Sequence, residues 1–264
     1  MNSARRILYV SHEVECGGAE LSLLELLAAP ARARYQPVLA TSGDGPLRTA
    51  AAALDVPVVE VPMRAAGRWQ KVRRALAAGR KLAEIAEQQQ VALIHANTII
   101  AGWAGLIAAR RSRRPLVWHV RDIGYPVAAR RACRRAMRIV ANSQATATAL
   151  ALPPRHAERI RVVYNGVAPE FFATHRPTMA AGRAAHRQAL LARLQGGDST
   201  GIGAIECDAP WLGMVGRLDA WKGHATAIRT LAVLERATRL VLVGGALFGT
   251  ENRTAELSAL ADSL

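Results

Sequence analysis

The chain has 264 residues, of which 51% are hydrophobic and 21% are charged. This composition predicts a folded protein with one large or two modest domains, and it excludes a disordered chain. The formal net charge is +15, and nearly all of the excess lies in residues 64–138, where 17 Lys and Arg stand against three acids. Such a block favours contact with an anionic membrane or acceptor over merely solvated helix faces. Nucleic acid is not expected as a partner, because no recognition motif or stacking aromatic series accompanies the charge.

The first 168 residues alternate short apolar segments with helical ones. Apolar runs of this length, separated by helices, predict parallel βαβ units and therefore an open, doubly wound α/β sheet. The predicted strands are 6–11, 37–41, 57–61, 91–95, 116–120, 138–141 and 160–163, and the predicted helices are 20–29, 47–54, 69–89, 100–110, 127–135 and 143–150.

This alternation stops after Val167 and resumes at Pro210. Proline, glycine and polar residues predict a linker over 169–208. A buried strand over 210–215 and a helix from Gly223 then follow. We therefore expect an N-terminal Rossmann-like domain over 1–168 and the beginning of a second, donor-binding Rossmann-like domain over 209–264.

The stretch 91–109 carries no formal charge and approaches the length of a membrane span. A strand followed by a helix is the favoured interpretation, because His95, Asn97 and Thr98 interrupt the apolar run. We see no signal peptide, and the three cysteines form no CxxC, metal or disulfide pattern. A cytoplasmic protein is expected, at the inner face of the membrane if the basic block binds lipid.

Polar side chains stand at the ends of two predicted central strands. His95 is the last residue of one of them and Asn97 follows it, whereas His119 lies near the end of the next and Arg121 and Asp122 follow that strand. Ligands of open α/β sheets sit beyond the carboxyl ends of the strands, where a histidine can hydrogen-bond a sugar hydroxyl or help a proton move. A functional role is favoured for His119, whereas His95 and Asn97 are equally well explained as structural residues.

Two glycine-bracketed turns lead from a strand into a helix. Gly17 and Gly18 open the first helix, and the second turn is Gly216–Gly223, which carries Arg217 and Lys222. A helix N-terminus with an added Arg and Lys is suited to a diphosphate. No dinucleotide fingerprint lies at the first turn, and the chain has no Walker A sequence and no G-x-S-x-G elbow, which disfavours nicotinamide enzymes, P-loop NTPases and α/β hydrolases.

The motifs and their order resemble glycosyltransferase family 4. The resemblance rests on Gly-Gly-Ala-Glu at 17–20, Trp-His-Val-Arg-Asp at 118–122, Ala-Asn-Ser at 141–143, Val-Tyr-Asn-Gly-Val at 163–167 and Val-Gly-Arg-Leu-Asp-x-x-Lys-Gly at 215–223. It implies the GT-B fold of two Rossmann-like domains and a retaining, metal-independent transfer of sugar from a nucleotide-diphosphate sugar to a saccharide or lipid-linked acceptor. No cofactor is expected.

The resemblance also implies roles for particular residues. His119, Arg217 and Lys222 would be catalytic. The donor diphosphate would lie against Gly17, Gly18, Gly216, Arg217 and Lys222, and the acceptor side would comprise His95, Asn97, Arg121 and Asp122.

One element of the family pattern is missing. The family places a Glu-x7-Glu pair further along the second domain, and no two glutamates of this chain are eight positions apart. We therefore expect a truncated chain with impaired or no transfer activity. Two alternatives stay open, a non-catalytic protein that binds anionic membranes or polyanions through its basic domain, and a different two-domain enzyme of this fold such as a sugar-phosphate epimerase.

Overall fold

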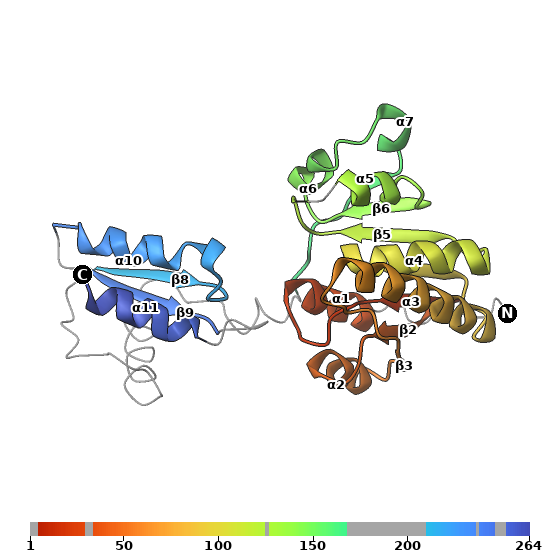
Figure 1. The fold of residues 1–264 in the computed structure, drawn as a ribbon, viewed down its shortest axis with the longest axis horizontal. Coiled ribbons are helices and arrows are strands. Elements are labelled where there is room, and N and C mark those ends of the chain that lie inside the picture. The colour runs from red at the N-terminus through yellow and green to blue at the C-terminus, as the bar shows by residue number, and fades with distance from the viewer. Residues whose placement is uncertain (1–4, 30–33, 125–126, 168–209, 236–237, 246–251) are drawn as a thin grey trace. The chain divides into compact units, whose positions relative to one another are not determined.

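A computed structural model describes residues 5–29, 34–124, 127–167, 210–235, 238–245 and 252–264 (Figure 1). The chain forms two compact units, Met1–Thr174 and His175–Leu264. The predicted linker, 169–208, lies outside the described residues.

The first unit is built on a seven-stranded sheet in which every neighbouring pair of strands is parallel, in the order β3-β2-β1-β4-β5-β6-β7. This order extends the Rossmann arrangement by one strand. The strands are β1 (Arg5–Val10), β2 (Tyr35–Thr41), β3 (Val58–Glu60), β4 (Leu93–Ala96), β5 (Leu116–Val120), β6 (Arg138–Ala141) and β7 (Ile160–Val162).

Helices cover both faces of the sheet, because successive side chains of a strand point to opposite faces. In β1, Leu8 and Val10 enter one core and Ile7 and Tyr9 enter the other. The helices of this unit are α1 (Gly18–Ala28), α2 (Pro46–Ala53), α3 (Arg68–Gln88), α4 (Ile99–Ser112), α5 (Val127–Cys133), α6 (Gln144–Ala149) and α7 (Pro154–Ala157). All predicted strands and helices of 1–168 are present, and α7 is the one described helix of this unit that the prediction missed.

Residues 91–109 form β4 and most of α4, as the strand-plus-helix interpretation predicted. Thr98 caps α4 by accepting a hydrogen bond from the Ala101 amide (3.2 Å). Gly102 lets the first turns of α4 pack on β5, since a Cβ there would overlap the Trp118 indole. No helix among the described residues combines the length and the hydropathy needed to cross a bilayer.

The second unit contains β8 (Trp211–Val215), the short 3-10 helix η2 (Ala220–Lys222), α10 (His224–Ala232), β9 (Arg239–Val243) and α11 (Arg253–Asp262). β8 and β9 are parallel, as in a Rossmann-like half. The predicted strand at 210–215 is confirmed but its burial is wrong, since Leu212 is 48% and Val215 82% exposed. Among the described residues β8 has a neighbouring strand on one side only, which leaves much of its apolar surface uncovered.

Candidate active site

The first unit has a topological switch point between β1 and β4. The chain leaves β1 towards α1 on one face and leaves β4 towards α4 on the other. Loops that diverge in this way open a crevice at the carboxyl ends of the strands, where ligands of doubly wound sheets bind. Ser11, Asn97 and Arg121 directly follow β1, β4 and β5, so the predicted polar residues lie at this edge.

Arg121 is the centre of a hydrogen-bond network at the edge. Its Nε and Nη2 donate to the Asn97 Oδ1 (3.3 and 2.9 Å), and its Nη1 donates to the Asn165 Oδ1 (3.3 Å). Asn165 also accepts a hydrogen bond from the Ser22 hydroxyl (3.1 Å) on α1. The buried Asn97 side chain donates to the Ala19 carbonyl (3.1 Å). The network therefore joins the ends of β4 and β5 to the first turns of α1.

Arg121 also fixes the protonation of His119. The Arg121 Nη2 lies 3.2 Å from the His119 Nδ1. Because a guanidinium only donates, Nδ1 must be the acceptor, and the single proton of the neutral ring is then on Nε2. Burial, and next the charge of Arg121, lower the pKa of His119 to about 3, so the ring is neutral at physiological pH.

The His119 Nε2 is buried and has no hydrogen-bond partner in the described structure. His95 lies beside it, with ring centroids 5.7 Å apart, and its Nε2 is likewise buried and unpartnered. Burial, followed by the charge of Arg121, lowers the pKa of His95 to about 4. Buried polar atoms in native proteins usually have a partner, so two orphaned imidazole nitrogens side by side indicate that a ligand hydroxyl or water completes this site.

Gly17 and Gly18 lie at the N-terminus of α1. Gly17 is in an extended conformation and caps the helix without a side chain, and a Cβ on Gly18 would meet no atom within 4 Å. The chain's own packing therefore gives no reason for a glycine at 18. Glu20, in the first turn, is buried and accepts a hydrogen bond from the Ser11 hydroxyl (3.1 Å). This carboxylate already complements the helix dipole and reduces the attraction of the N-terminus for a second anion.

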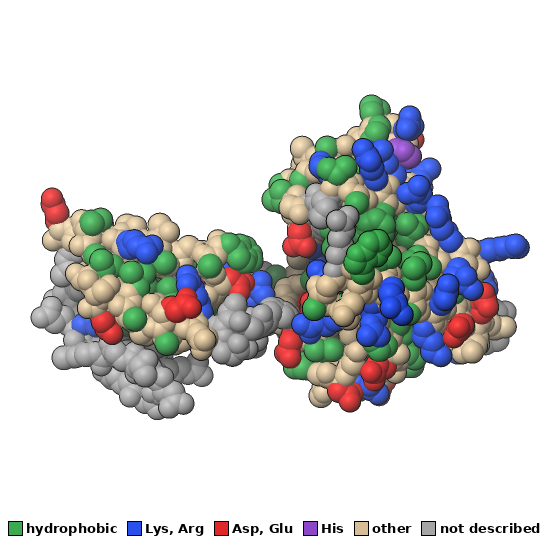
Figure 2. Space-filling view, in the orientation of Figure 1, with side chains coloured by type: hydrophobic (Ala, Val, Ile, Leu, Met, Phe, Trp, Pro, Cys, Tyr) green, Lys and Arg blue, Asp and Glu red, His purple; other side chains and the backbone are tan. Residues whose placement is uncertain are grey.

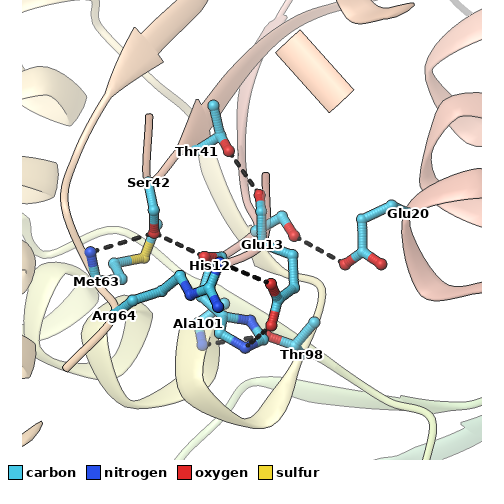
Figure 3. Close-up of polar contacts among 10 residues, drawn as sticks. His12, Glu13, Glu20, Thr41, Ser42, Met63, Arg64, Thr98 and Ala101 are labelled. Carbon is cyan, nitrogen blue, oxygen red and sulfur yellow. Dashed lines mark hydrogen bonds and ion pairs between the residues drawn. The ribbon is translucent and has the colours of Figure 1, made fainter. Parts of the chain in front are cut away.

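A second polar cluster holds the loop between β1 and α1 (Figure 3). The His12 ring lies between Thr98 and Glu13, with its Nδ1 2.8 Å from the Thr98 hydroxyl and its Nε2 2.9 Å from the Glu13 carboxylate. The hydroxyls of Thr41 and Ser42 donate to the Glu13 and His12 carbonyls (2.7 Å each). Both ring nitrogens of His12 are therefore engaged, so His12 positions the loop and has no nitrogen left for a substrate.

The hydrogen bond to His12 lowers the pKa of Glu13 more than burial raises it, and the charges of His12 and Arg64 lower it further. Glu13 is thus an anion that holds the loop near neutral pH. The sequence interpretation predicted neither this clamp of His12 and Glu13 nor the contact of Asn165 with Arg121. A histidine and an acid directly after a buried strand was the available signal.

The cationic turn of the second unit connects β8 to α10. The Arg217 guanidinium forms an ion pair with Asp219 (2.9 Å), and the Lys222 ammonium lies 4.1 Å from the centroid of the Trp221 ring. Gly223 has φ +87° and is both the last cap of η2 and the first cap of α10, a left-handed conformation that favours glycine. Lys222 therefore directly precedes the N-terminus of α10, whose first amides have no partner within the helix.

The turn is supported from behind by the end of β9. The Gly216 amide donates to the Val243 carbonyl (2.9 Å), and the Leu218 amide donates to the Gly245 carbonyl (3.1 Å). A Cβ on Gly244 would overlap the Gly216 carbonyl, so only glycine permits this approach. Gly244 was not among the predicted site residues, although the Gly-Gly pair after an apolar strand could have indicated it.

The structure thus brings His95, Asn97, His119 and Arg121 together in the first unit. Asp122 follows them at an exposed position. Gly17 and Gly18 belong to the same edge through the contacts of α1, and Gly216, Arg217 and Lys222 form a separate group in the second unit. Among the described residues no cluster of three or more His, Cys, Asp or Glu side chains has the arrangement of a metal site.

Comparison with known proteins decides the family. The model of Glycosyltransferase Family 4 matches residues 16–171, which is more than half of the chain. The chain belongs to glycosyltransferase family 4. This confirms the resemblance inferred from the motifs.

Solved structures of glycosyltransferases confirm the fold of this family 4 chain. It is similar to Anabaena HepE in complex with UDP-glucose, with 27% identity and a TM-score of 0.73 over 98% of this chain and 66% of HepE. A glycosyltransferase from Rickettsia africae shares the fold, with 17% identity and a TM-score of 0.68 over 99% of this chain and 65% of that protein. Sucrose-phosphate synthase from Thermosynechococcus elongatus also shares it, with 14% identity and a TM-score of 0.67 over 98% of this chain and 67% of that protein. The chain therefore spans about two thirds of the length of these proteins. A search of the curated proteins finds no match.

Proposed function

We propose that this family 4 protein transfers a sugar from a nucleotide-diphosphate sugar to a saccharide or lipid-linked acceptor, with retention, in the biosynthesis of a polysaccharide or glycolipid. The observation that carries the proposal is the likeness to HepE, which was crystallised with UDP-glucose, along 98% of this chain. The cationic turn and the orphaned histidine nitrogens are the features that a donor of this chemistry would use.

The diphosphate is assigned to the turn Gly216–Gly223. Arg217 offers a guanidinium that is paired with Asp219, and Lys222 offers an ammonium on the residue that directly precedes Gly223, the N-cap of α10. When the bond from the sugar to the diphosphate breaks, negative charge grows on the leaving oxygen, and cations fixed there beforehand stabilise that charge. We propose that these two side chains supply the neutralisation, with no metal ion or other cofactor.

His119 is assigned to the transferred sugar as a hydrogen-bond donor. Its Nε2 carries the proton, and its pKa of about 3 makes it a poor base. An acceptor hydroxyl must then lose its proton elsewhere. The departing diphosphate oxygen can take that proton if the acceptor approaches on the face that the diphosphate leaves, and this path forms the new bond with retention. Asn97, Arg121, Asp122 and His95 would line the acceptor side.

The donor site of this chain lacks an acidic pair. No two glutamates are eight positions apart, so the Glu-x7-Glu contact to sugar and ribose is missing from these 264 residues. We expect the chain to bind a nucleoside diphosphate weakly and to transfer sugar poorly or not at all. Efficient transfer from UDP-glucose by the purified chain would contradict this expectation.

Titration calorimetry with UDP and UDP-glucose tests the proposal. Arg217→Ala and Lys222→Ala should each weaken binding by about tenfold to a hundredfold, because a hydrogen bond to a charged group contributes about 1.5–3 kcal/mol. Arg229→Ala, an exposed arginine on α10, is the matched control and should bind as the parent does. Unchanged affinity in both variants would refute the assignment of the diphosphate. A chain that binds anionic vesicles but no UDP would favour the non-catalytic binding protein.

A further inference from the structure

The first half of α3 exposes a stripe of large apolar side chains. Trp69, Val72 and Leu76 recur at spacings of three and four residues and are 81%, 51% and 44% exposed. Such spacing normally marks the face of a helix that is packed on a core. The buried residues of α3 begin only at Ala78, so the stripe lies on the half of the helix that the rest of the described chain leaves uncovered.

The first turns of α4 extend this apolar surface. At Gly79 a Cβ would lie 2.5 Å from the Ile107 Cβ, so α3 and α4 make their close contact there. One turn towards the N-terminus of each helix stand Leu76 and Trp103, and two turns away stand Val72 and Ile100. Both helices follow parallel strands and start at the same edge of the sheet, so these pairs run alongside each other.

We call Trp69, Val72, Leu76, Ile100 and Trp103 the α3–α4 patch. Ile100 and Trp103 are 38% and 36% exposed, which is high for side chains of this size next to a core. Figure 2 shows hydrophobic side chains gathered over the α3–α4 region of the first unit, with Lys and Arg side chains around them. Contiguous apolar surface with a polar rim marks an interaction site.

The rim of the patch carries one sign of charge. Residues 61–83 contain seven cations and no acid, and the first acidic residue after them is Glu84. Arg73 and Arg80 follow Trp69 and Leu76 by four residues, so they lie next to the stripe on the same side of the helix. The remaining cations of this segment are Arg64, Arg68, Lys71, Arg74 and Lys81, of which Arg64 pairs with Glu13 and Lys81 with Glu84 (3.6 Å each).

We propose that the α3–α4 patch docks on the surface of an anionic lipid bilayer. Tryptophan and aliphatic side chains enter the headgroup region, and neighbouring Lys and Arg side chains bind anionic lipids. A second copy of the chain fits this surface poorly, because two such patches facing each other would bring Arg73 and Arg80 of one copy against Arg73 and Arg80 of the other. An anionic lipid surface supplies the complementary charge.

The position of the patch relates it to the site. α4 begins at Ile99, directly after Asn97 and Thr98 at the carboxyl edge of the sheet. Docking through the first turns of α3 and α4 would therefore hold the edge that carries His119 and Arg121 close to the lipid headgroups. Delivery of a lipid-linked acceptor to that edge rests on the proposed function, whereas docking itself requires neither donor nor acceptor.

Co-sedimentation with vesicles tests the docking surface. The full chain should bind vesicles of phosphatidylcholine mixed with phosphatidylglycerol and should not bind phosphatidylcholine alone. Arg73→Glu/Arg80→Glu should weaken binding by about tenfold or more, because each cation near the membrane contributes on the order of one factor of five. Trp69→Gln/Leu76→Gln should weaken it to a similar degree, and both pairs are exposed enough to leave the fold intact.

Two matched controls keep the proposal falsifiable. Arg155→Glu/Arg161→Glu makes the same change of charge at the hollow lined by Arg138, Arg155, Glu158, Arg159 and Arg161, and it should have at most a small effect. Val233→Gln replaces a 77% exposed side chain of the second unit and should have none. Equal losses in the two arginine pairs would show attraction to net charge alone and would overturn the assignment of the patch.

Three further outcomes would also overturn the proposal. The first is that the parent chain does not bind anionic vesicles. The second is that the Trp69→Gln/Leu76→Gln variant binds them as tightly as the parent. The third is that the parent forms a concentration-dependent dimer and this variant does not. Calorimetry with UDP on the same preparations separates the two proposals, because loss of vesicle binding with UDP binding retained refutes docking only. The reverse result refutes the assignment of the donor.

Discussion

Replacing Arg121 with methionine should change the protonation of the site more than any other single substitution. The guanidinium donates to Asn97, Asn165 and His119, and its charge is the second cause, after burial, of the low pKa of both His119 and His95. Methionine keeps the apolar stem and removes the charge and all three donors. The pKa values of about 3 and about 4 should therefore rise, and they should stay below 6.5 because burial remains.

The stability of the first unit should fall at the same time. The buried Asn97 Oδ1 accepts from both Nε and Nη2 and would lose both partners. An unsatisfied buried acceptor costs about 1–3 kcal/mol, and the exposed Asn165 can replace its partner with water. A net loss of about 2 kcal/mol corresponds to a fall in melting temperature of about 6 °C for a unit of this size.

Nitrogen-15 NMR of the imidazoles measures both effects of Arg121 on His119. The parent should show the Nε2–H tautomer at pH 7 and no protonation above pH 5. In Arg121→Met the ring should titrate at a higher pH, and Arg121→Lys should keep the low pKa while loosening the bond to Nδ1. The reasoning is wrong if the parent ring carries its proton on Nδ1, or if Arg121→Met leaves the pKa at about 3.

Two further predictions follow from burial and close packing. His95 and His119 are neutral in the folded protein and titrate near pH 6.5 in the unfolded chain. Their contribution to the free energy of unfolding is therefore fully present above pH 6.5, and it should fall by about 2 kcal/mol per histidine at pH 5. Melting curves between pH 8 and 5 check this, and His119→Asn should give a shallower decline; an equal slope would contradict the pKa assignments. Gly102→Ala should destabilise the protein by about 3 kcal/mol through overlap with Trp118, whereas Gly18→Ala should melt like the parent, because a Cβ there meets no atom within 4 Å. Equal melting temperatures for the two alanine variants would refute the packing argument.

Much of the fold was predictable because it depends on local patterns. Apolar runs of strand length between helical segments predicted the parallel sheet, and every strand of the first unit lies within two residues of its predicted bounds. The burial of β8 was predicted wrongly, because apolar composition indicates a strand but not which elements cover it.

The sequence predicted which residues lie at the candidate site, but it did not predict their hydrogen bonds or protonation states. The positions of His119, Arg121 and Asn97 at or just after the ends of strands predicted a shared edge, which the structure shows. The contact of Glu20 with Ser11 and the clamp of His12 and Glu13 were not predicted, because a histidine and an acid after a strand can equally bind a ligand or hold their own loop.

The sequence by itself determined the family and the parallel α/β architecture, because both are recorded in the spacing and order of short motifs. Only the tertiary structure decided that His119 is a neutral donor. That state depends on Arg121, which is in turn oriented by Asn97 and Asn165, residues 24 and 44 positions away. Proton positions follow from which groups meet in a buried space, and burial is a property of the assembled fold rather than of any local run of residues.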